Sequence, residues 1–429
     1  MRRLLVRRSL TAVGIYASVV LGFVGTVVAT HELGSARVFG DYATVLFATS
    51  FLQSFFDLTV EEALVKYGFR YSTREDWGRF RGLFADAMRV KLAGSLCGAI
   101  GLVVFSQLAP SRLEVPLLLA AGIPLGQSLE GLAGSMLYLR GRYDIRSAFL
   151  AWSMALRLAG IAIGAHFGLR EAIGGVLAAQ VVSTASVGVI GLVAFRRFPR
   201  AATASLGSER REIVSFVLQS SAATGVLSLR GGLAPLLLGA VTNTTQVGLF
   251  RVAQSPQSGF QALSAPARMV LLTEQTRDWE KGRQSTVLRG VRRYTLAAFV
   301  LAVVAVPPLY YWMPDLVRLV YTSKFVGASN AARLFVLAAA VQLVVGWTKS
   351  FPVTIGRPGL RLLTHGIETA VVLPLVLVFG ALWGATGAAG AVLVGMCAFA
   401  VVWAFVFARI EPEDVELPAP IIDTGAVLP

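Results

Sequence analysis

The feature that most constrains this chain is the recurrence, from one end to the other, of long apolar runs almost free of charge. An α-helix rises 1.5 Å per residue, so a run of about 20 apolar residues crosses the roughly 30 Å hydrocarbon core of a bilayer. Of the 429 residues, 55% are hydrophobic and only 15% are charged, whereas soluble globular proteins carry about 25% charged residues. The pattern predicts an all-α polytopic membrane protein without a separate soluble domain.

We predict twelve membrane-spanning helices joined by short connections. The first follows Arg2, Arg3, Arg7 and Arg8 and is longer than the apolar core of about 7 to 15 residues in a signal peptide, so we interpret it as a true span. The predicted spans are 9–30, 42–61, 92–108, 115–139, 147–167, 171–195, 213–238, 247–272, 294–313, 333–353, 362–380 and 385–408.

The distribution of Lys and Arg predicts the orientation of these spans, because basic residues favour cytoplasmic loops. The N-terminus, alternate loops and Arg409 hold 30 of the 39 basic residues, and the opposite loops hold only 6. Both termini are therefore expected on the cytoplasmic side of the membrane. A basic cytoplasmic face meets anionic lipid headgroups, so the net charge of +15 requires no nucleic-acid partner.

Two other features carry no cofactor or metal prediction. Cys97 and Cys397 lie in apolar runs, and neither belongs to a CxxC motif or a His-containing ligand pattern. The tail 411–429 has five acidic residues, no basic residue and four prolines, which is typical of a disordered cytoplasmic end.

The two halves of the chain resemble each other at an offset of about 208 residues. Leu33-Gly34 followed by 39–42 recurs as Leu238-Gly239 followed by 247–250, and Arg81-Gly82 recurs as Arg289-Gly290. We therefore predict two six-helix lobes, 1–200 and 201–410, related by a pseudo-two-fold axis along the membrane normal. Such lobes leave a central cleft that can rock open to either side.

The same residues carry a family resemblance. The segment from Leu33-Gly34 to Phe39-Gly40-Asp41-Tyr42, then Asp57-Leu58 and Ala63-Leu64-Val65-Lys66-Tyr67, resembles the start of bacterial polysaccharide-type flippases. Arg140-Gly141-Arg142-Tyr143 and Val247-Gly248-Leu249-Phe250 are also similar to segments of these proteins. They belong to the multidrug, oligosaccharidyl-lipid and polysaccharide exporter superfamily. The resemblance implies a V-shaped cavity between the lobes and the export of undecaprenyl-diphosphate-linked glycans.

Charged residues deep inside the spans are the candidates for substrate binding, because an ion near the middle of a bilayer requires a partner or a wet cavity. Arg157, Arg230 and Glu130 lie near the middle of spans, and Arg251 lies about one turn inside its span. Guanidinium groups suit a diphosphate because they make forked, charge-assisted hydrogen bonds. For Arg157 an interhelical pair with Glu130 is the alternative, and snorkelling to the surface is the alternative for Arg251.

The acidic residues Asp57 and Glu61 admit two interpretations. They are candidates for proton or cation coupling, or else they mark the solvated end of a helix. His31, His166 and His365 have no ligand spacing, and we assign them no catalytic role.

These observations together predict a non-enzymatic flippase that works by alternating access. Its expected partners are the lipid-linked glycan, membrane lipids, glycosyltransferases and a polysaccharide polymerase. The chain has no GxxxxGK[ST] motif, which disfavours an ATP-driven pump. Three alternatives remain: a cation-coupled drug antiporter of the same superfamily, a membrane-embedded glycosyl transferase or polymerase, and a passive scaffold.

Overall fold

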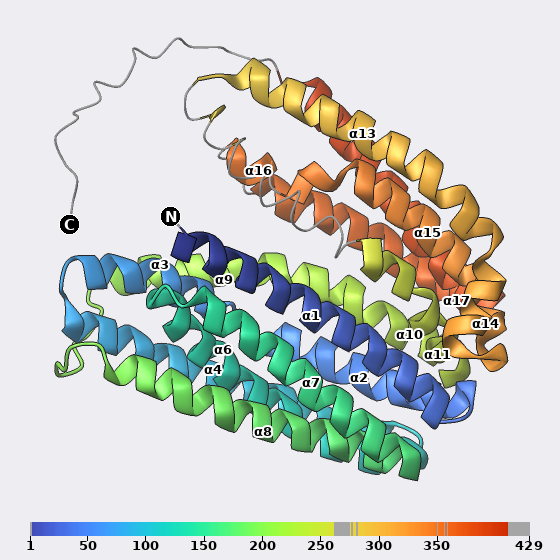
Figure 1. The fold of residues 1–429 in the computed structure, drawn as a ribbon, viewed down its shortest axis with the longest axis horizontal. Coiled ribbons are helices and arrows are strands. Elements are labelled where there is room, and N and C mark those ends of the chain that lie inside the picture. The colour runs from blue at the N-terminus through green and yellow to red at the C-terminus, as the bar shows by residue number, and fades with distance from the viewer. Residues whose placement is uncertain are drawn as a thin grey trace.

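A computed structural model describes residues 2–260, 275, 278–279, 282–349, 351–355, 357 and 359–410. Every regular element in these residues is a helix (Figure 1). The α-helices are α1 (Arg2–Glu32), α2 (Ala36–Phe56), α3 (Val60–Thr73), α4 (Trp77–Leu108), α5 (Ser111–Ala120), α6 (Gly122–Leu139), α7 (Tyr143–Phe167), α8 (Leu169–Arg196), α9 (Glu209–Ser228), α10 (Ala234–Val241), α11 (Thr244–Ala253), α13 (Gln284–Tyr311), α14 (Met313–Tyr321), α15 (Ser329–Val344), α16 (Phe351–Thr354) and α17 (Gly359–Ala408). Shorter turns are the π-helix η1 (Leu229–Leu233) and the 3-10 helices η2 (Ser323–Ala328) and η3 (Gly346–Lys349).

The membrane-spanning pattern confirms the predicted all-α polytopic class. The described residues contain ten helical stretches long and apolar enough to cross a bilayer. One of them, α17, is two helices that meet at Gly384, where φ is 59°, so it covers the last two predicted spans. The predicted span 247–272 is represented by α11 and by helical residues 255–260, and its remainder lies outside the described residues.

Several boundaries differ from the prediction for identifiable reasons. The second span breaks after Asp57 and continues as a separate helix, α3. The third span begins at Trp77, fifteen residues before the predicted Leu92, because Asp76 caps it: its Oδ1 accepts a hydrogen bond from the N–H of Arg79 at 3.0 Å. Hydropathy identifies only the apolar part of a helix, and this helix begins before its apolar part, at the residue after its cap.

The internal repeat is visible in how the second helix of each lobe begins. Helix α2 begins at Ala36 and α11 at Thr244, which are 208 residues apart in sequence. Both have a side-chain cap: Ser35 Oγ accepts from the N–H of Val38, and Asn243 Oδ1 accepts from the N–H of Gln246. The offset inferred from short motifs therefore corresponds to equivalent helix starts in the two lobes.

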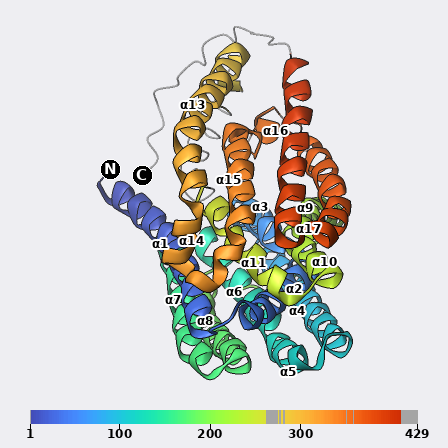
Figure 2. The same ribbon diagram turned by 90° about the vertical axis from the view of Figure 1, so that its right-hand side faces the viewer.

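The two lobes form a V. In Figure 1 the bundle of α13, α15 and α17 diverges from the bundle of α4, α7 and α8 on one side and meets it on the other, and Figure 2 shows the two bundles from the meeting side. We call the meeting side the apex, and we call the end where α1 begins and α17 ends the terminal end. A single apolar core links both lobes at the apex and includes Phe39, Phe250 and Phe325. Separate cores fill each lobe toward the terminal end.

Helices α2 and α11 cross in close contact at the apex. A Cβ atom on Gly40 would lie 1.8 Å from the carbonyl oxygen of Thr244, and a Cβ on Gly248 would lie 2.9 Å from the Cα of Gly40. Only glycine permits this approach of two backbones. The crossing places the lobes in direct contact on the axis that relates them.

Polar contacts reinforce the apex. Arg112 Nε bonds to Asp41 Oδ2 at 3.0 Å within the first lobe, and Arg112 Nη2 reaches Thr244 Oγ1 of the other lobe at 3.4 Å. Lys324 Nζ donates to the carbonyl oxygen of Gly34 at 2.6 Å and also joins the lobes. The apex is therefore sealed by backbone packing, aromatic packing and charged donors.

At the terminal end the first half of α9 lies against α3. Tyr71 Oη donates to Glu209 at 2.6 Å, and Arg70 pairs with Glu212 at 3.2 Å. Thr59 N–H donates to Ser221 Oγ at 3.0 Å. The chain therefore passes from one lobe to the other along α9 and η1, and the lobe boundary near residue 200 stays a prediction.

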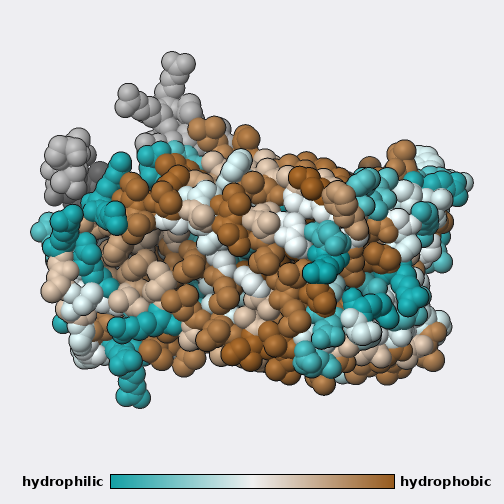
Figure 3. Space-filling view, turned by 90° about the horizontal axis from the view of Figure 1, so that it is seen from below, coloured by the Kyte–Doolittle hydropathy of each residue, from teal (hydrophilic) through white to brown (hydrophobic). Residues whose placement is uncertain are grey.

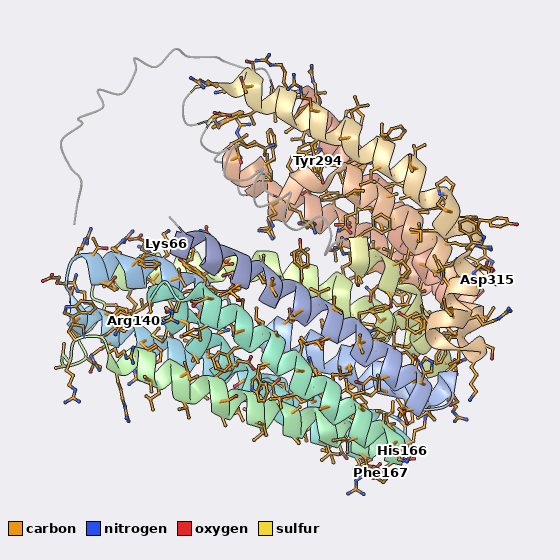
Figure 4. All side chains as sticks on the ribbon, viewed as in Figure 1. Lys66, Arg140, His166, Phe167, Tyr294 and Asp315 are labelled. Carbon is orange, nitrogen blue, oxygen red and sulfur yellow. The ribbon has the colours of Figure 1, made fainter. Side chains whose placement is uncertain are left out.

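Side-chain chemistry agrees with a membrane environment. Apolar side chains dominate the middle of the face drawn in Figure 3, and hydrophilic side chains gather toward its two ends. In Figure 4 Lys66 and Arg140 lie at the terminal end, whereas His166 and Asp315 lie at the apex end. Successive loops thus alternate between the two ends, as the predicted spans require.

Candidate functional site: a basic cavity between the lobes

A polar cavity of about 590 Å³ lies between the lobes, just below the crossing of α2 and α11. Helices α1, α2 and α7 line it from the first lobe, and η1, α11 and residues 254–258 line it from the second. Among the described residues no aspartate or glutamate lines this cavity. Its polar lining residues are Thr26, Tyr42, Thr49, Ser50, Gln53, Ser54, Gln127, Arg157, Ser228, Arg251, Gln254, Gln257 and Ser258.

Each lobe contributes one cation to the cavity. Arg157 comes from α7 and Arg251 from α11, and both side chains are half-buried. No carboxylate in the described part of the chain pairs with either guanidinium. Arg251 has its Cζ 5.4 Å from the centre of the Phe47 ring of the opposite lobe, a cation–π contact. Arg157 and Arg251 thus line the same cavity from opposite lobes.

Tyr42 connects the crossing to the cavity. It follows Gly40 by two residues in α2, is only 3% exposed and lines the cavity. Tyr42, Arg157 and Arg251 therefore line the same cavity. Tyr42 belongs to a motif noted in the sequence, but its position in the cavity was not predicted because only charged residues were considered.

The amide side chains of the cavity wall were also not predicted. Gln53, Gln127, Gln254 and Gln257 lie inside apolar spans, and all four line the cavity. An amide group in hydrocarbon requires a hydrogen-bond partner, as a charged group does, although the cost of leaving an amide unpaired is smaller. The signal was therefore present in the sequence as glutamine within otherwise apolar runs.

An apolar groove of about 630 Å³ adjoins the cavity. It lies between α1, through Val20 and Phe23, and α14, through Leu316 and Val320. Arg251, Gln254 and Ser258 line both the groove and the cavity, so the two spaces lie side by side. A ligand with a charged head and a hydrocarbon chain could place one part in each.

The structure places Arg230 outside the central cavity. It lies in the π-helix η1, where Nη1 bonds to Glu368 Oε1 of α17, and His365 Nδ1 lies 3.0 Å from Glu368 Oε2. Glu368 is 1% exposed. The charge of Arg230 is therefore compensated within its own lobe in this conformation. The residues beside it, Gly231 and Gly232, are the ones that reach the cavity.

Glu130 is also outside the cavity. It is 6% exposed in α6 and accepts hydrogen bonds from Gln180 Nε2 at 3.0 Å and Ser183 Oγ at 3.2 Å, both from α8. Its nearest cation is Arg146, whose Nη1 lies 3.9 Å from Oε1. The alternative pairing of Glu130 with Arg157 is absent from the described contacts, and Glu130 instead joins α6 to α8.

The carboxylates Asp57 and Glu61, which were predicted to couple an ion, both contact a lysine of the protein. Lys91 Nζ of α4 bonds to Asp57 Oδ1 and lies 2.6 Å from Glu61 Oε1. The Lys91 side chain is fully buried, and each carboxylate is about three-quarters buried. This arrangement ties the break between α2 and α3 to α4. A coupling role for Asp57 and Glu61 stays a prediction.

Comparison with known proteins identifies the family. The model of the polysaccharide biosynthesis protein family matches residues 8–272, more than half of the chain. The chain belongs to this family. Its membership confirms the resemblance inferred from the sequence motifs. No curated protein sequence matches this family member.

Several solved structures have folds similar to that of this chain. It is similar to the lipid II flippase MurJ in an inward closed conformation, with a TM-score of 0.75 at 13% identity, covering 94% of this chain and 88% of that one. It is also similar to an inward-facing multidrug resistance MATE transporter, with a TM-score of 0.68 at 12% identity and coverage of 94% and 97%. A transporter of the same superfamily from Pyrococcus furiosus has a TM-score of 0.60 at 13% identity, with 94% of each chain covered. At these identities the likeness concerns the fold alone.

Proposed function

We propose that this protein translocates undecaprenyl-diphosphate-linked oligosaccharide from the inner to the outer leaflet of the bacterial plasma membrane by alternating access. The observation that carries the proposal is the pair Arg157 and Arg251, one from each lobe, in a cavity whose described lining has no carboxylate. A diphosphate diester carries about two negative charges, and moving an unpaired ion into hydrocarbon costs tens of kcal/mol by Born estimates. Two guanidiniums replace part of its hydration with forked hydrogen bonds.

The shape of the site supports an amphiphilic substrate. The amide and hydroxyl groups of the cavity wall offer donors and acceptors for sugar hydroxyls. The adjoining apolar groove between α1 and α14 offers a place for the prenyl chain beside the cavity. Only the headgroup then has to enter the polar cavity, and the chain stays in an apolar environment throughout.

The open and sealed ends define the direction of access. If both termini lie in the cytoplasm, as the distribution of Lys and Arg predicts, the apex seal faces outward and the V opens inward. A substrate entering from the inner leaflet would meet Arg157 and Arg251 directly below the seal. Export would then require α2 and α11 to separate at Gly40 and Gly248 while the terminal end closes.

The alternatives receive less support from this site. A cation-coupled antiporter requires a carboxylate that exchanges its cation with the solvent, and the described cavity lining has none. The carboxylates Asp57, Glu61 and Glu368 each bind a lysine or arginine of the protein. A glycosyl transferase requires an acid and base beside the substrate, which the described lining also lacks.

The proposal is tested by translocation of labelled lipid-linked oligosaccharide in vesicles containing the purified protein. Arg157→Gln and Arg251→Gln are expected to lower the rate, whereas Arg318→Gln, an exposed residue at the apex end, serves as the control. In cells, depletion of the protein should trap glycan-loaded carrier on the inner leaflet. Parent-level translocation by the protein with both cavity arginines replaced would overturn the proposal.

A further inference from the structure

A second polar cavity, of about 270 Å³, lies at the terminal end of the second lobe, beside the first turns of α13. Gln275, Asp278, Arg289 and Arg293 line it. None of its described lining residues also lines the central cavity. It is therefore a site separate from the central cavity.

The position of this cavity is fixed by its surroundings. The N–H of Arg283 donates to the carbonyl oxygen of Asp278 at 2.9 Å, and the N–H of Gly282 donates to that of Trp279 at 2.9 Å. Trp279 packs edge-on against Phe351, with ring centres 6.3 Å apart. These contacts hold Asp278 against the start of α13.

Helix α13 is fixed in rotation by its buried face. Val287 and Val291 are 2% and 1% exposed, and Tyr294 Oη donates to the carbonyl oxygen of Leu343 at 3.0 Å. Figure 4 shows Tyr294 between α13 and α15. Arg289 and Arg293 are consequently held on the exposed side of the helix, one turn apart.

Gln275 is the observation that points to a ligand. Its side chain is 4% exposed and lines the cavity, and neither its amide nitrogen nor its amide oxygen has a hydrogen-bond partner in the described part of the chain. A buried amide whose donors and acceptor have no partners is unfavourable. Arg293 likewise has no ion-pair partner among the described residues. An occupant with both acceptors and donors would satisfy these groups.

The face of α13 beyond the cavity is apolar. Leu296, Val300 and Val303 follow Arg293 at helical spacing and are 65%, 54% and 56% exposed. A phosphate held by Arg289 and Arg293 would have hydrocarbon surface directly beside it along the helix. This continuity favours a lipid over a free phosphate ion.

We propose that this cavity binds the headgroup of an anionic phospholipid of the phosphatidylglycerol type. The phosphodiester contacts Arg289 and Arg293, and the glycerol hydroxyls contact Asp278 and Gln275. The acyl chains lie along the exposed apolar face of α13 beyond Arg293. Asp278 disfavours a second phosphate charge in the same space and accepts hydrogen bonds from headgroup hydroxyls. Basic pockets at the cytoplasmic ends of membrane helices suit such headgroups.

The test uses the full-length protein in detergent and counts bound lipids by native mass spectrometry during titration with short-chain phosphatidylglycerol. Arg289→Gln and Arg293→Gln are each expected to weaken binding about five-fold, because a basic residue near an anionic lipid surface contributes about 1 kcal/mol. Arg292→Gln is the matched control, because Arg292 neighbours Arg293 on the helix and does not line the cavity. Phosphatidylcholine is expected to bind more weakly than phosphatidylglycerol.

A steric variant separates the cavity from its charge. A Cβ on Gly290 would meet no atom within 4 Å, so Gly290→Leu is accommodated by the helix and fills the space with all charges kept. It is expected to weaken phosphatidylglycerol binding while the unfolding temperature stays near that of the parent. Equal weakening by Arg292→Gln, unchanged binding to Gly290→Leu, or displacement of the lipid by millimolar inorganic phosphate would each overturn the proposal.

Discussion

Gly40 of α2 and Gly248 of α11, 208 residues apart in sequence, lie in contact where the two lobes cross. A Cβ on Gly248 would lie 2.9 Å from the Cα of Gly40. The two glycines occupy equivalent places in the internal repeat, so the same position of each lobe contributes to this contact. The seal of the cavity depends on this pair.

Replacing either glycine should open the apex. Gly40→Ala and Gly248→Ala each place a methyl group against backbone atoms that cannot rotate away, and overpacking of this kind costs about 1–3 kcal/mol. We expect a lower unfolding temperature and greater labelling of a cysteine introduced at Thr244. Gly174→Ala is the control, because a Cβ there meets no atom within 4 Å. Equal effects of all three substitutions would contradict a specific contact.

Lys91 should be a structural cation. Lys91→Met removes the charge between Asp57 and Glu61, and an uncompensated buried charge costs about 3–5 kcal/mol. We expect strong destabilisation in thermal unfolding, with part of it recovered when Asp57→Asn is combined with Lys91→Met. If Asp57→Asn alone instead abolishes a dependence of transport on sodium or on a proton gradient, the coupling prediction for Asp57 and Glu61 is supported.

The pair Arg230 and Glu368 can be separated from substrate binding by a double variant. Arg230→Gln leaves Glu368 buried without its cation, so we expect lower stability and lower translocation. Arg230→Gln combined with Glu368→Gln removes both charges and should recover most of the stability. Recovered stability without recovered translocation would indicate that Arg230 contacts the substrate, as its position deep inside a predicted span suggested.

Membrane potential should accelerate export. With the inside negative, moving two negative charges outward is favoured by about 4.6 kcal/mol per 100 mV if they cross the whole field. Vesicles with an imposed potassium diffusion potential are therefore expected to translocate the labelled substrate faster than vesicles at zero potential. A rate unaffected by potential would indicate that the charges cross fully compensated.

The sequence predicted the fold well and the site in part. Long apolar runs identify spans because lipid imposes the same length on each of them, and the repeat offset followed from glycine motifs at the lobe contact. Depth along a span, however, does not report which way a side chain points. Arg157 and Arg251 face the cavity, whereas Arg230 faces Glu368, a partner 138 residues away. That contact depends on a π-turn and a helix packing that no local pattern encodes.

The central claim is that Arg157 and Arg251 together hold the diphosphate of the substrate. Translocation of labelled lipid-linked oligosaccharide in vesicles tests it most directly, with Arg157→Gln, Arg251→Gln, both together, and Arg318→Gln inserted at equal levels. A hydrogen bond to a charged group contributes about 1.5–3 kcal/mol, so each cavity substitution should slow translocation by about ten-fold or more. Arg318→Gln should leave the rate unchanged. Parent rates in the vesicles with both cavity arginines replaced would contradict the claim.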